Sequence, residues 1–320
     1  MSALSSAYTS FLAVVALHAA AVLWRRTQYC ATKHLSTALK WPEEVQRRGE
    51  LVVVTRVHNR SAAQLADPVD VQAFVAAALP YAARVIVCIG YHEADTNKNL
   101  FGLQNYLKTL AAHLHTSLGS ARATRVTLLP VTPWGSFTTA LNAATNVAVD
   151  GGFAFIAFQS LEFRLRAETA TRLLHCLAAD EDLLVAGPAL EGHEFLHGRQ
   201  ALRGRTCPWN TCAIWSLRHL AILGFPPLGD AYGTAYGGVE EVSAIWVAQV
   251  VRPQLRALLV RCAKPSDTVL QWQTDFEDAQ RAAWHASKMR SKDERPAAQL
   301  QLIGGAAARG WVEHVEFDDL

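Results

Sequence analysis

Short β-branched runs alternate with stretches of helical spacing over residues 51–188, and this alternation restricts the fold more than any other feature of the chain. The strand-like runs are 51–57, 84–90, 125–131, 152–158 and 182–188, and the helix-like stretches between them are 69–83, 100–118, 136–150 and 167–180. Buried strands of this kind are typical of a parallel sheet with helices on both faces. The sequence therefore predicts an α/β fold with a mainly parallel, Rossmann-like sheet flanked by helices.

The chain changes character after residue 190. In order, we expect a polar loop, an aromatic-rich segment, a Gly- and Pro-rich stretch, a helix, a strand and a charged amphipathic helix, over residues 192–206, 207–225, 226–238, 239–251, 255–262 and 273–292. The helix over 239–251 carries Glu240 and Glu241 in its first turn, where the helix dipole favours negative charge.

The first residues of the chain form a separate apolar segment. Residues 3–24 contain no charged side chain, and Arg25 and Arg26 follow immediately. This length can cross a hydrocarbon core, so we predict a single-pass membrane anchor over residues 1–26. No Lys or Arg precedes the segment, which favours an uncleaved anchor over a signal peptide. A transit peptide is the alternative, because the first acidic residue is Glu43.

The charge bias around this segment also orients it. The positive residues lie on its C-terminal side, which predicts that the folded domain faces the cytoplasm. The lumenal side of the Golgi or endoplasmic reticulum is the alternative. After the anchor we expect a linker over 27–49, an α/β domain over 50–265, and a C-terminal helical extension and tail over 266–320.

Composition excludes some classes of partner. The net charge is +2 at pH 7, and basic residues are scattered among acidic ones, so we expect no nucleic acid partner. The six cysteines include no CxxC pair, and no histidine pair completes a zinc spacing.

Ligands of open parallel sheets bind beyond the carboxyl ends of the strands. The residues at these positions are 56–60, 90–95 and 159–162. Polar side chains are frequent there, so we predict that Asn59, Asp95 and the 159–162 turn converge on one pocket.

Five short motifs follow one another at sensible spacing. They are Asn59-Arg60 after the first strand, Asp95 after the second, Gly135 with Ala140 and Asn142, Gly224-Phe225, and Gly237-Gly238-Val239-Glu240-Glu241. Their order over roughly residues 50–262 resembles the family 2 glycosyltransferases, which have the GT-A fold. The resemblance implies a nucleotide-sugar donor, UDP- or GDP-linked, and a glycan, lipid or protein acceptor at a membrane surface.

The resemblance also implies roles for particular residues. The donor-binding candidates are Arg56, His58, Asn59, Tyr91, Asp95, Asn142, Gln159, Ser160 and Glu162. Gly90 or Tyr91 stands where the family has an aspartate that reads the base. Tyr91 could stack on the base instead, or it could be an ordinary packed or exposed loop tyrosine. The acceptor-binding candidates are Trp209, Asn210 and Gly238.

The chain departs from the family at the metal-binding Asp-x-Asp. Gln159, Ser160 and Leu161 replace it, and Glu162 is the one carboxylate in the turn. Mg²⁺ and Mn²⁺ prefer hard oxygen ligands, so Glu162 is the candidate metal ligand. The substitution predicts that metal binding is weaker than in the family, moved or absent.

Inverting sugar transfer needs a base that takes a proton from the acceptor hydroxyl. Glu241 matches the family's aspartate and is the predicted base, with Glu240 positioning it or the acceptor. The alternative is that both are solvent-facing helix carboxylates. Arg203 and Arg205 could bind the donor diphosphate in place of metal charge, or they could be exposed loop arginines.

Three functional classes remain open on this basis. The first is an active, inverting glycosyltransferase, and the second is a GT-A domain that has lost catalysis and serves as a binding or scaffold subunit. The third is another nucleotide-binding enzyme, such as a nucleotidyltransferase. The ordered Gly-Phe and Gly-Gly-x-Glu-Glu motifs favour the first class over the third.

Overall fold

The computed structural model describes residues 50–59, 65–91, 97–132, 134–135, 137–230, 237–262, 269–272, 283, 287, 291–302 and 310–320. Within these ranges no helix combines the length and the apolar character that a membrane crossing requires. The predicted anchor over 1–26 and the linker over 27–49 lie outside the described residues.

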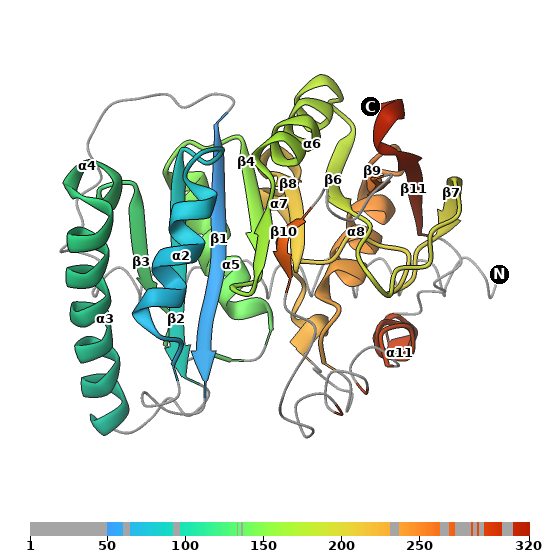
Figure 1. Ribbon diagram of the computed structural model, residues 1–320. Coiled ribbons are helices and arrows are strands. Elements are labelled where there is room, and N and C mark those ends of the chain that lie inside the picture. Colours follow the sequence, from blue (N-terminus) through green and yellow to red (C-terminus); the bar gives the residue numbers. More distant parts are fainter. Residues whose placement is uncertain are drawn as a thin grey trace.

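One nine-stranded sheet forms the centre of the molecule, with the strand order β3-β2-β1-β4-β8-β6-β9-β11-β7 (Figure 1). The strands of its first half are β1 (Leu51–Asn59), β2 (Arg84–Tyr91), β3 (Val126–Pro130) and β4 (Phe155–Gln159). They pair in parallel, β1 with both β2 and β4, and β2 with β3. The predicted mainly parallel α/β sheet is confirmed in this half.

The second half of the sheet is mixed. Its strands are β6 (Leu183–Pro188), β7 (Gly198–Ala201), β8 (Cys212–Ser216), β9 (Arg256–Arg261) and β11 (Trp311–Glu316). β8 lies antiparallel between β4 and β6, and β7 pairs antiparallel with β11. The sequence did not indicate β8, because its five residues lie inside the aromatic-rich segment 207–225 and only one of them, Ile214, is β-branched.

Helices cover both faces of the sheet. Those with described bounds are α2 (Pro68–Ala78), α3 (Asn97–Leu118), α4 (Ser120–Ala123), α5 (Thr138–Asp150), α6 (Ala167–Ala179), α7 (Leu217–Leu223), α8 (Glu240–Val251) and α11 (Glu294–Leu302). α2 and α3 pack on one face, and α5, α7 and α8 pack on the other (Figure 1). Each face therefore has its own apolar core, as a doubly covered sheet requires.

A local signal explains where α2 begins. Asp67 caps α2, because its side chain accepts a hydrogen bond from the backbone N–H of Val69 at 2.8 Å, and Pro68 occupies the first helical position.

The short remaining elements are β5 (Phe163–Leu165), β10 (Val269–Trp272), η2 (Pro227–Asp230) and η4 (Phe317–Asp319). β5 and β10 form a separate two-stranded antiparallel sheet.

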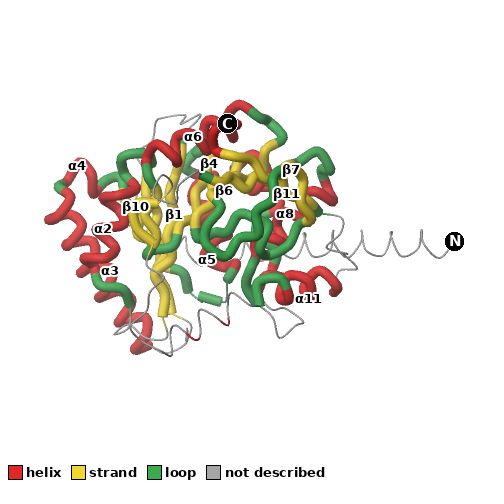
Figure 2. The backbone as a smooth tube through the Cα atoms, turned by 45° about the vertical axis from the view of Figure 1, so that its right-hand side comes forward, coloured by secondary structure: helices red, strands yellow, loops and turns green. Residues whose placement is uncertain are grey.

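The C-terminal residues complete the fold instead of extending from it. β11 pairs in parallel with β9 and antiparallel with β7, at the end of the sheet opposite to α3 and α4 (Figure 2). The sheet therefore continues past residue 265, where we placed the end of the domain. Local sequence did not reveal this, because the partners of β11 lie far away along the chain. Of the predicted helix over 273–292, only residues 283, 287, 291 and 292 are described.

Candidate functional site

β1 extends past its neighbour β4 at the carboxyl edge of the sheet. The pairing of these strands ends at Val54 opposite Phe158, whereas β1 continues to Asn59. Side chains alternate between the two faces of a strand, so Arg56 and His58 lie on the same face of the sheet as Val54. Val54 packs in the core on the face that α5 covers. The extension therefore brings Arg56 and His58 to the side of the edge where α5 and α8 begin.

Two buried carboxylates begin α8 at this edge. Glu240 and Glu241 are only 4% and 5% exposed, so they are not the solvent-facing helix carboxylates of the alternative interpretation. A Glu241 carboxylate oxygen accepts a short hydrogen bond from the backbone N–H of Asn210. The Asn210 side-chain amide donates to Glu240 Oε1 at 3.4 Å and accepts from Trp215 Nε1 at 3.0 Å. Asn210 thus positions both carboxylates from inside the protein.

Arg56 connects the carboxylate pair to β1. Its Nη1 lies 3.6 Å from Glu240 Oε1 and donates to the carbonyl oxygen of Phe137 at 3.3 Å. The Arg56 side chain is 25% exposed, while that of Glu240 is 6% exposed. The predicted site residues Arg56, Glu240, Glu241 and Asn210 are therefore brought together.

Burial changes the acidity of this cluster. Removal from water, followed by the negative charge of Glu240, raises the pKa of Glu241 to about 7, while Lys292 and the Asn210 N–H act in the opposite direction. A carboxyl group with this pKa exchanges its proton near neutral pH, which suits general base chemistry.

The backbone entering α8 is strained. Val239 has φ of 59° and is the one non-glycine residue with positive φ in the described ranges, next to Gly238 at φ of 95°. A β-branched residue in this region costs on the order of 1–3 kcal/mol and persists only where the surroundings impose it. From α11, Arg295 Nη1 donates to the Gly237 carbonyl at 3.2 Å and Gln299 Nε2 to the Gly238 carbonyl at 3.0 Å.

Asp230 is a neighbouring carboxylate that the sequence analysis missed. It accepts hydrogen bonds from the backbone N–H of Thr138 at 2.7 Å and from the Thr138 hydroxyl at 2.5 Å, and so caps α5 from a distance. Burial raises its pKa. Its place in the Gly- and Pro-rich stretch before Glu240 was the available signal, but a cap supplied from 92 residues away has no local pattern.

Asn142 joins two of the motifs to each other. Its Nδ2 donates to the Phe225 carbonyl, and its Oδ1 accepts from the Phe225 backbone N–H, both at 2.9 Å. The side chain is 3% exposed. The Ala-x-Asn and Gly-Phe motifs therefore hold α5 against the segment after α7. Asn142 makes its hydrogen bonds in the core and does not face a nucleotide-sugar site.

The residues in place of Asp-x-Asp do not fit a divalent ion. Gln159 Oε1 accepts from the Tyr81 hydroxyl at 2.9 Å, and its Nε2 donates to the Phe163 carbonyl at 2.8 Å. The Ser160 carbonyl accepts from the Phe163 N–H in a tight turn that leaves Glu162 exposed. No group of three His, Cys, Asp or Glu residues in the described part of the chain could hold an ion.

Trp209 is buried between two other side chains. The His193 ring stacks on it with centroids 3.6 Å apart, and Lys292 Nζ lies 3.0 Å from its centroid. Two groups this close to one centroid must lie on opposite faces of the ring, so neither face is open to a sugar. Burial and Lys292 lower the pKa of His193 to about 3, which keeps that ring neutral.

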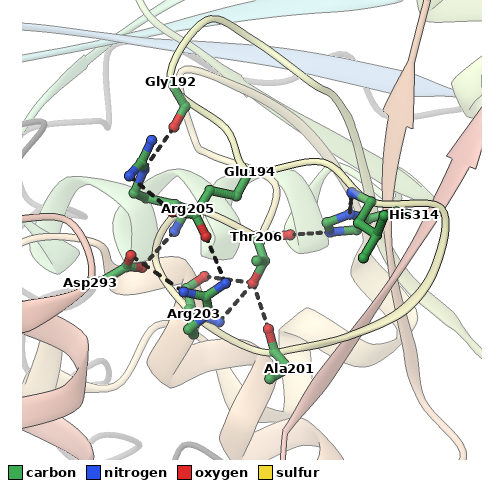
Figure 3. A network of polar contacts seen from close by, with 9 residues as sticks. Gly192, Glu194, Ala201, Arg203, Arg205, Thr206, Asp293 and His314 are labelled. Carbon is green, nitrogen blue, oxygen red and sulfur yellow. Dashed lines mark hydrogen bonds and ion pairs between the residues drawn. The ribbon is translucent and has the colours of Figure 1, made fainter.

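Arg203 and Arg205 are engaged by carboxylates (Figure 3). Glu194 lies 2.7 Å from Arg203 Nη2 and 2.9 Å from Arg205 Nη1. The Asp293 carboxylate accepts from the backbone N–H of Arg205 at 2.9 Å and lies 3.9 Å from Arg203. These arginines hold the loop after β7 to the segment before α11, and their charge is already compensated.

Trp134 covers the end of β2 and was also missed. It is 1% exposed and stacks on His58 with ring centroids 4.8 Å apart. Only glycine fits beneath it, because a Cβ at Gly90 would lie 2.5 Å from the Val131 carbonyl and would overlap the Trp134 ring. Of Asn59 and Tyr91 only the backbone is described, and Asp95 lies outside the described residues.

A groove of about 410 Å³ lies at the opposite, amino edge of the sheet. Its lining includes Phe155 at the start of β4, Asp180 before β6, and Leu217 at the start of α7. It contains none of the predicted site residues. The candidate site is therefore the carboxylate cluster at the carboxyl edge.

No protein-family model matches the sequence, and a search of the curated proteins gives no match. Similar solved structures include a mannosyltransferase from Pyrobaculum calidifontis in complex with GDP-Man and Mn²⁺ (16% identity, 92% of this chain, 76% of that chain, TM-score 0.48). Another is glucosyl-3-phosphoglycerate synthase from Mycobacterium tuberculosis (14% identity, 84% of this chain, 87% of that chain, TM-score 0.44). A third is a cytidylyltransferase from Leptospira borgpetersenii (9% identity, 80% of this chain, 94% of that chain, TM-score 0.39). At these values the likeness assigns no donor, acceptor or mechanism. The mostly parallel sheet flanked by helices fits a GT-A-like fold.

Proposed function

We propose that the protein transfers a sugar from a nucleotide-sugar to an acceptor hydroxyl, with the Glu240–Glu241 pair as its base centre. The observation that carries the proposal is this buried carboxylate pair, held by Asn210 and Arg56 at the carboxyl edge of the sheet. Ligands of open α/β sheets bind at that edge. The ordered motifs that resemble family 2 glycosyltransferases give the same indication.

The proposed reaction is a single displacement. The acceptor hydroxyl loses its proton to Glu241 while its oxygen forms a bond to the anomeric carbon of the sugar. The bond between that carbon and the diphosphate oxygen breaks, and the nucleoside diphosphate leaves with the electron pair. Attack opposite the leaving group inverts the anomeric centre. Glu240 keeps the pKa of Glu241 raised and holds Arg56.

A panel of nucleotide-sugars tests the donor class. A UDP- or GDP-sugar that binds the folded protein should raise its melting temperature, by an amount that increases with ligand concentration. Thermal unfolding of the full-length protein with UDP-, GDP- and CMP-sugars, followed by product detection with glycan, lipid and protein acceptors, would measure this. The free monosaccharides serve as controls and should give no shift.

The outcomes of the panel separate the functional classes. A nucleotide-sugar that binds and is transferred to an acceptor or to water supports the proposal. Binding without any transfer would instead favour a GT-A domain that serves as a binding or scaffold subunit. If no nucleotide-sugar changes the melting temperature, the proposed donor site is wrong.

The membrane surface is part of the proposal through the apolar segment before Arg25 and Arg26. We expect the full-length protein to sediment with membranes after alkaline washing, and a variant without residues 1–44 to remain in the supernatant with its melting transition preserved. Immunoblots of both fractions would show this. Full-length protein found in the soluble fraction would remove the membrane from the proposed function.

A further inference from the structure

The diphosphate of a nucleotide-sugar needs compensating positive charge as it leaves. In phosphoryl chemistry, Mg²⁺ or Mn²⁺, arginine or lysine supplies it. The described residues at the Asp-x-Asp position do not fit an ion, since the Gln159 side chain is engaged at both ends and Glu162 stands alone on an exposed turn. Cationic side chains at the carboxyl edge are therefore the groups to consider.

Three of the cations near the start of α8 already have partners. Arg203 and Arg205 are paired with Glu194 (Figure 3). Lys292 is 8% exposed, with its ammonium group 3.0 Å from the centroid of the Trp209 ring. Moving any of these groups to a ligand would leave a buried or half-buried partner without its contact.

Arg56 has guanidinium N–H groups without a hydrogen-bond partner among the described residues. Among its guanidinium atoms, Nη1 alone makes a hydrogen bond or ion pair with the described residues, to the Phe137 carbonyl and to Glu240 at 3.6 Å. The Nε and Nη2 groups make no hydrogen bond within the described chain. A guanidinium presents five N–H donors in a planar fork that suits phosphate oxygens.

Arg295, on α11, lies beside the backbone that enters α8. Its Nη1 donates to the Gly237 carbonyl at 3.2 Å, and no carboxylate within the described ranges pairs with it. A Cβ built on Gly238 would lie 3.6 Å from both Arg295 Nη1 and Phe137 Cε1. Arg56 contacts the carbonyl of Phe137, and Arg295 and the ring of Phe137 both lie next to Gly238, so the two guanidinium groups lie on the same side of the start of α8.

We infer that Arg56 and Arg295 bind the diphosphate of the donor and supply the charge that a divalent ion would otherwise provide. The inference rests on the proposed function, since it names the groups that hold the leaving diphosphate at that site. A rigid bidentate fork on β1 and a second guanidinium on α11 would bring two positive charges to one dianionic bridge. Glu240 then shares Arg56 with the diphosphate and lies close to the reacting carbon.

Binding of UDP, GDP and inorganic pyrophosphate to the full-length protein tests the inference, measured by calorimetry in EDTA and again with Mn²⁺. We expect binding in EDTA, and a loss of about 10- to 100-fold in affinity for Arg295→Gln and for Arg56→Gln. The lysine variants should retain more affinity than the glutamine variants because they keep the charge. UMP should lose less than UDP, because it lacks the second phosphate.

Matched controls identify the cause. Arg218→Gln removes an exposed arginine, 3.4 Å from Glu181 at the opposite edge of the sheet, and should leave all affinities unchanged. Glu162→Gln should also change nothing, since the metal role that the sequence suggested for it is not used. Melting temperatures of each variant without ligand show whether the fold is kept, and Arg295→Lys remains informative if Arg295→Gln does not fold.

Two outcomes overturn the inference in different ways. Binding that requires Mn²⁺, survives both arginine variants and disappears in Glu162→Gln would refute it while leaving the proposed function intact. Absence of any nucleoside diphosphate binding in either condition would refute the proposed function itself, and the inference with it.

Discussion

Replacing Glu241 with Gln should lower turnover by about 10²- to 10⁴-fold while nucleotide-sugar binding stays nearly unchanged. Glutamine keeps the size of the side chain and its acceptor oxygen for the Asn210 N–H, but it cannot take a proton. The experiment compares product formation under saturating donor with donor affinity by calorimetry. A variant that binds normally and retains full turnover would show that the base is another group.

The pH profile distinguishes a base from a structural residue. With a pKa of about 7 for Glu241, kcat/KM should rise with pH and level off above that value. In Glu240→Gln the rising limb should move to lower pH, because the negative neighbour that helps to raise the Glu241 pKa is gone. An unchanged profile in Glu240→Gln would contradict the coupling of the two carboxylates.

Stability should change with pH in the opposite sense to activity. The folded-state pKa of Glu241 lies above its value of 4.5 in an unfolded chain, so the unfolded state releases its proton first. The contribution of Glu241 to the free energy of unfolding is complete below that unfolded value and is lost as pH rises through about 7. Glu241→Gln should remove this part of the pH dependence. Urea unfolding at pH 5.5 and pH 8 would measure the difference.

Replacing Trp215 with Ala should cost about 3–5 kcal/mol in the free energy of unfolding. Trp215 is fully buried in β8, and its ring packs edge-on against Phe225 with centroids 5.2 Å apart. β8 joins the two halves of the sheet, so a cavity there weakens the contacts of both β4 and β6. Urea denaturation followed by circular dichroism would measure the loss. Ile222→Ala, at a side chain 52% exposed, is the control and should change stability by less than about 0.5 kcal/mol.

The milder Trp215→Phe links packing to the site. Phenylalanine retains most of the ring but lacks the indole N–H that donates to Asn210 Oδ1 at 3.0 Å. A buried acceptor without its partner costs about 1–3 kcal/mol. Because Asn210 also positions Glu240 and Glu241, turnover should fall together with stability. Normal turnover in a destabilised Trp215→Phe would show that Asn210 keeps its place without this bond.

The sequence by itself determined the parallel half of the sheet, two strands of the mixed half, and most of the helices that cover the sheet. β1, β2, β3, β4, β6 and β9 are short apolar or β-branched runs, and α2, α3, α5, α6 and α8 have helical spacing, so local sequence predicts each of them. The tertiary structure alone decided β7, β8 and β11. β7 is polar and becomes a strand only through its pairing with β11, about a hundred residues later.

The same division holds for the site. Glu240, Glu241, Arg56 and Asn210 could be selected as polar residues near strand ends and helix starts, and the structure brings them together. In the tertiary structure Asn142, Gln159 and Trp209 are buried in the interior, and Arg295 from α11 lies beside the start of α8. An amide or an indole has the same donors whether it faces a ligand or a neighbouring backbone group. Its hydrogen-bond partner depends on contacts between residues far apart in the chain, which the local sequence does not predict.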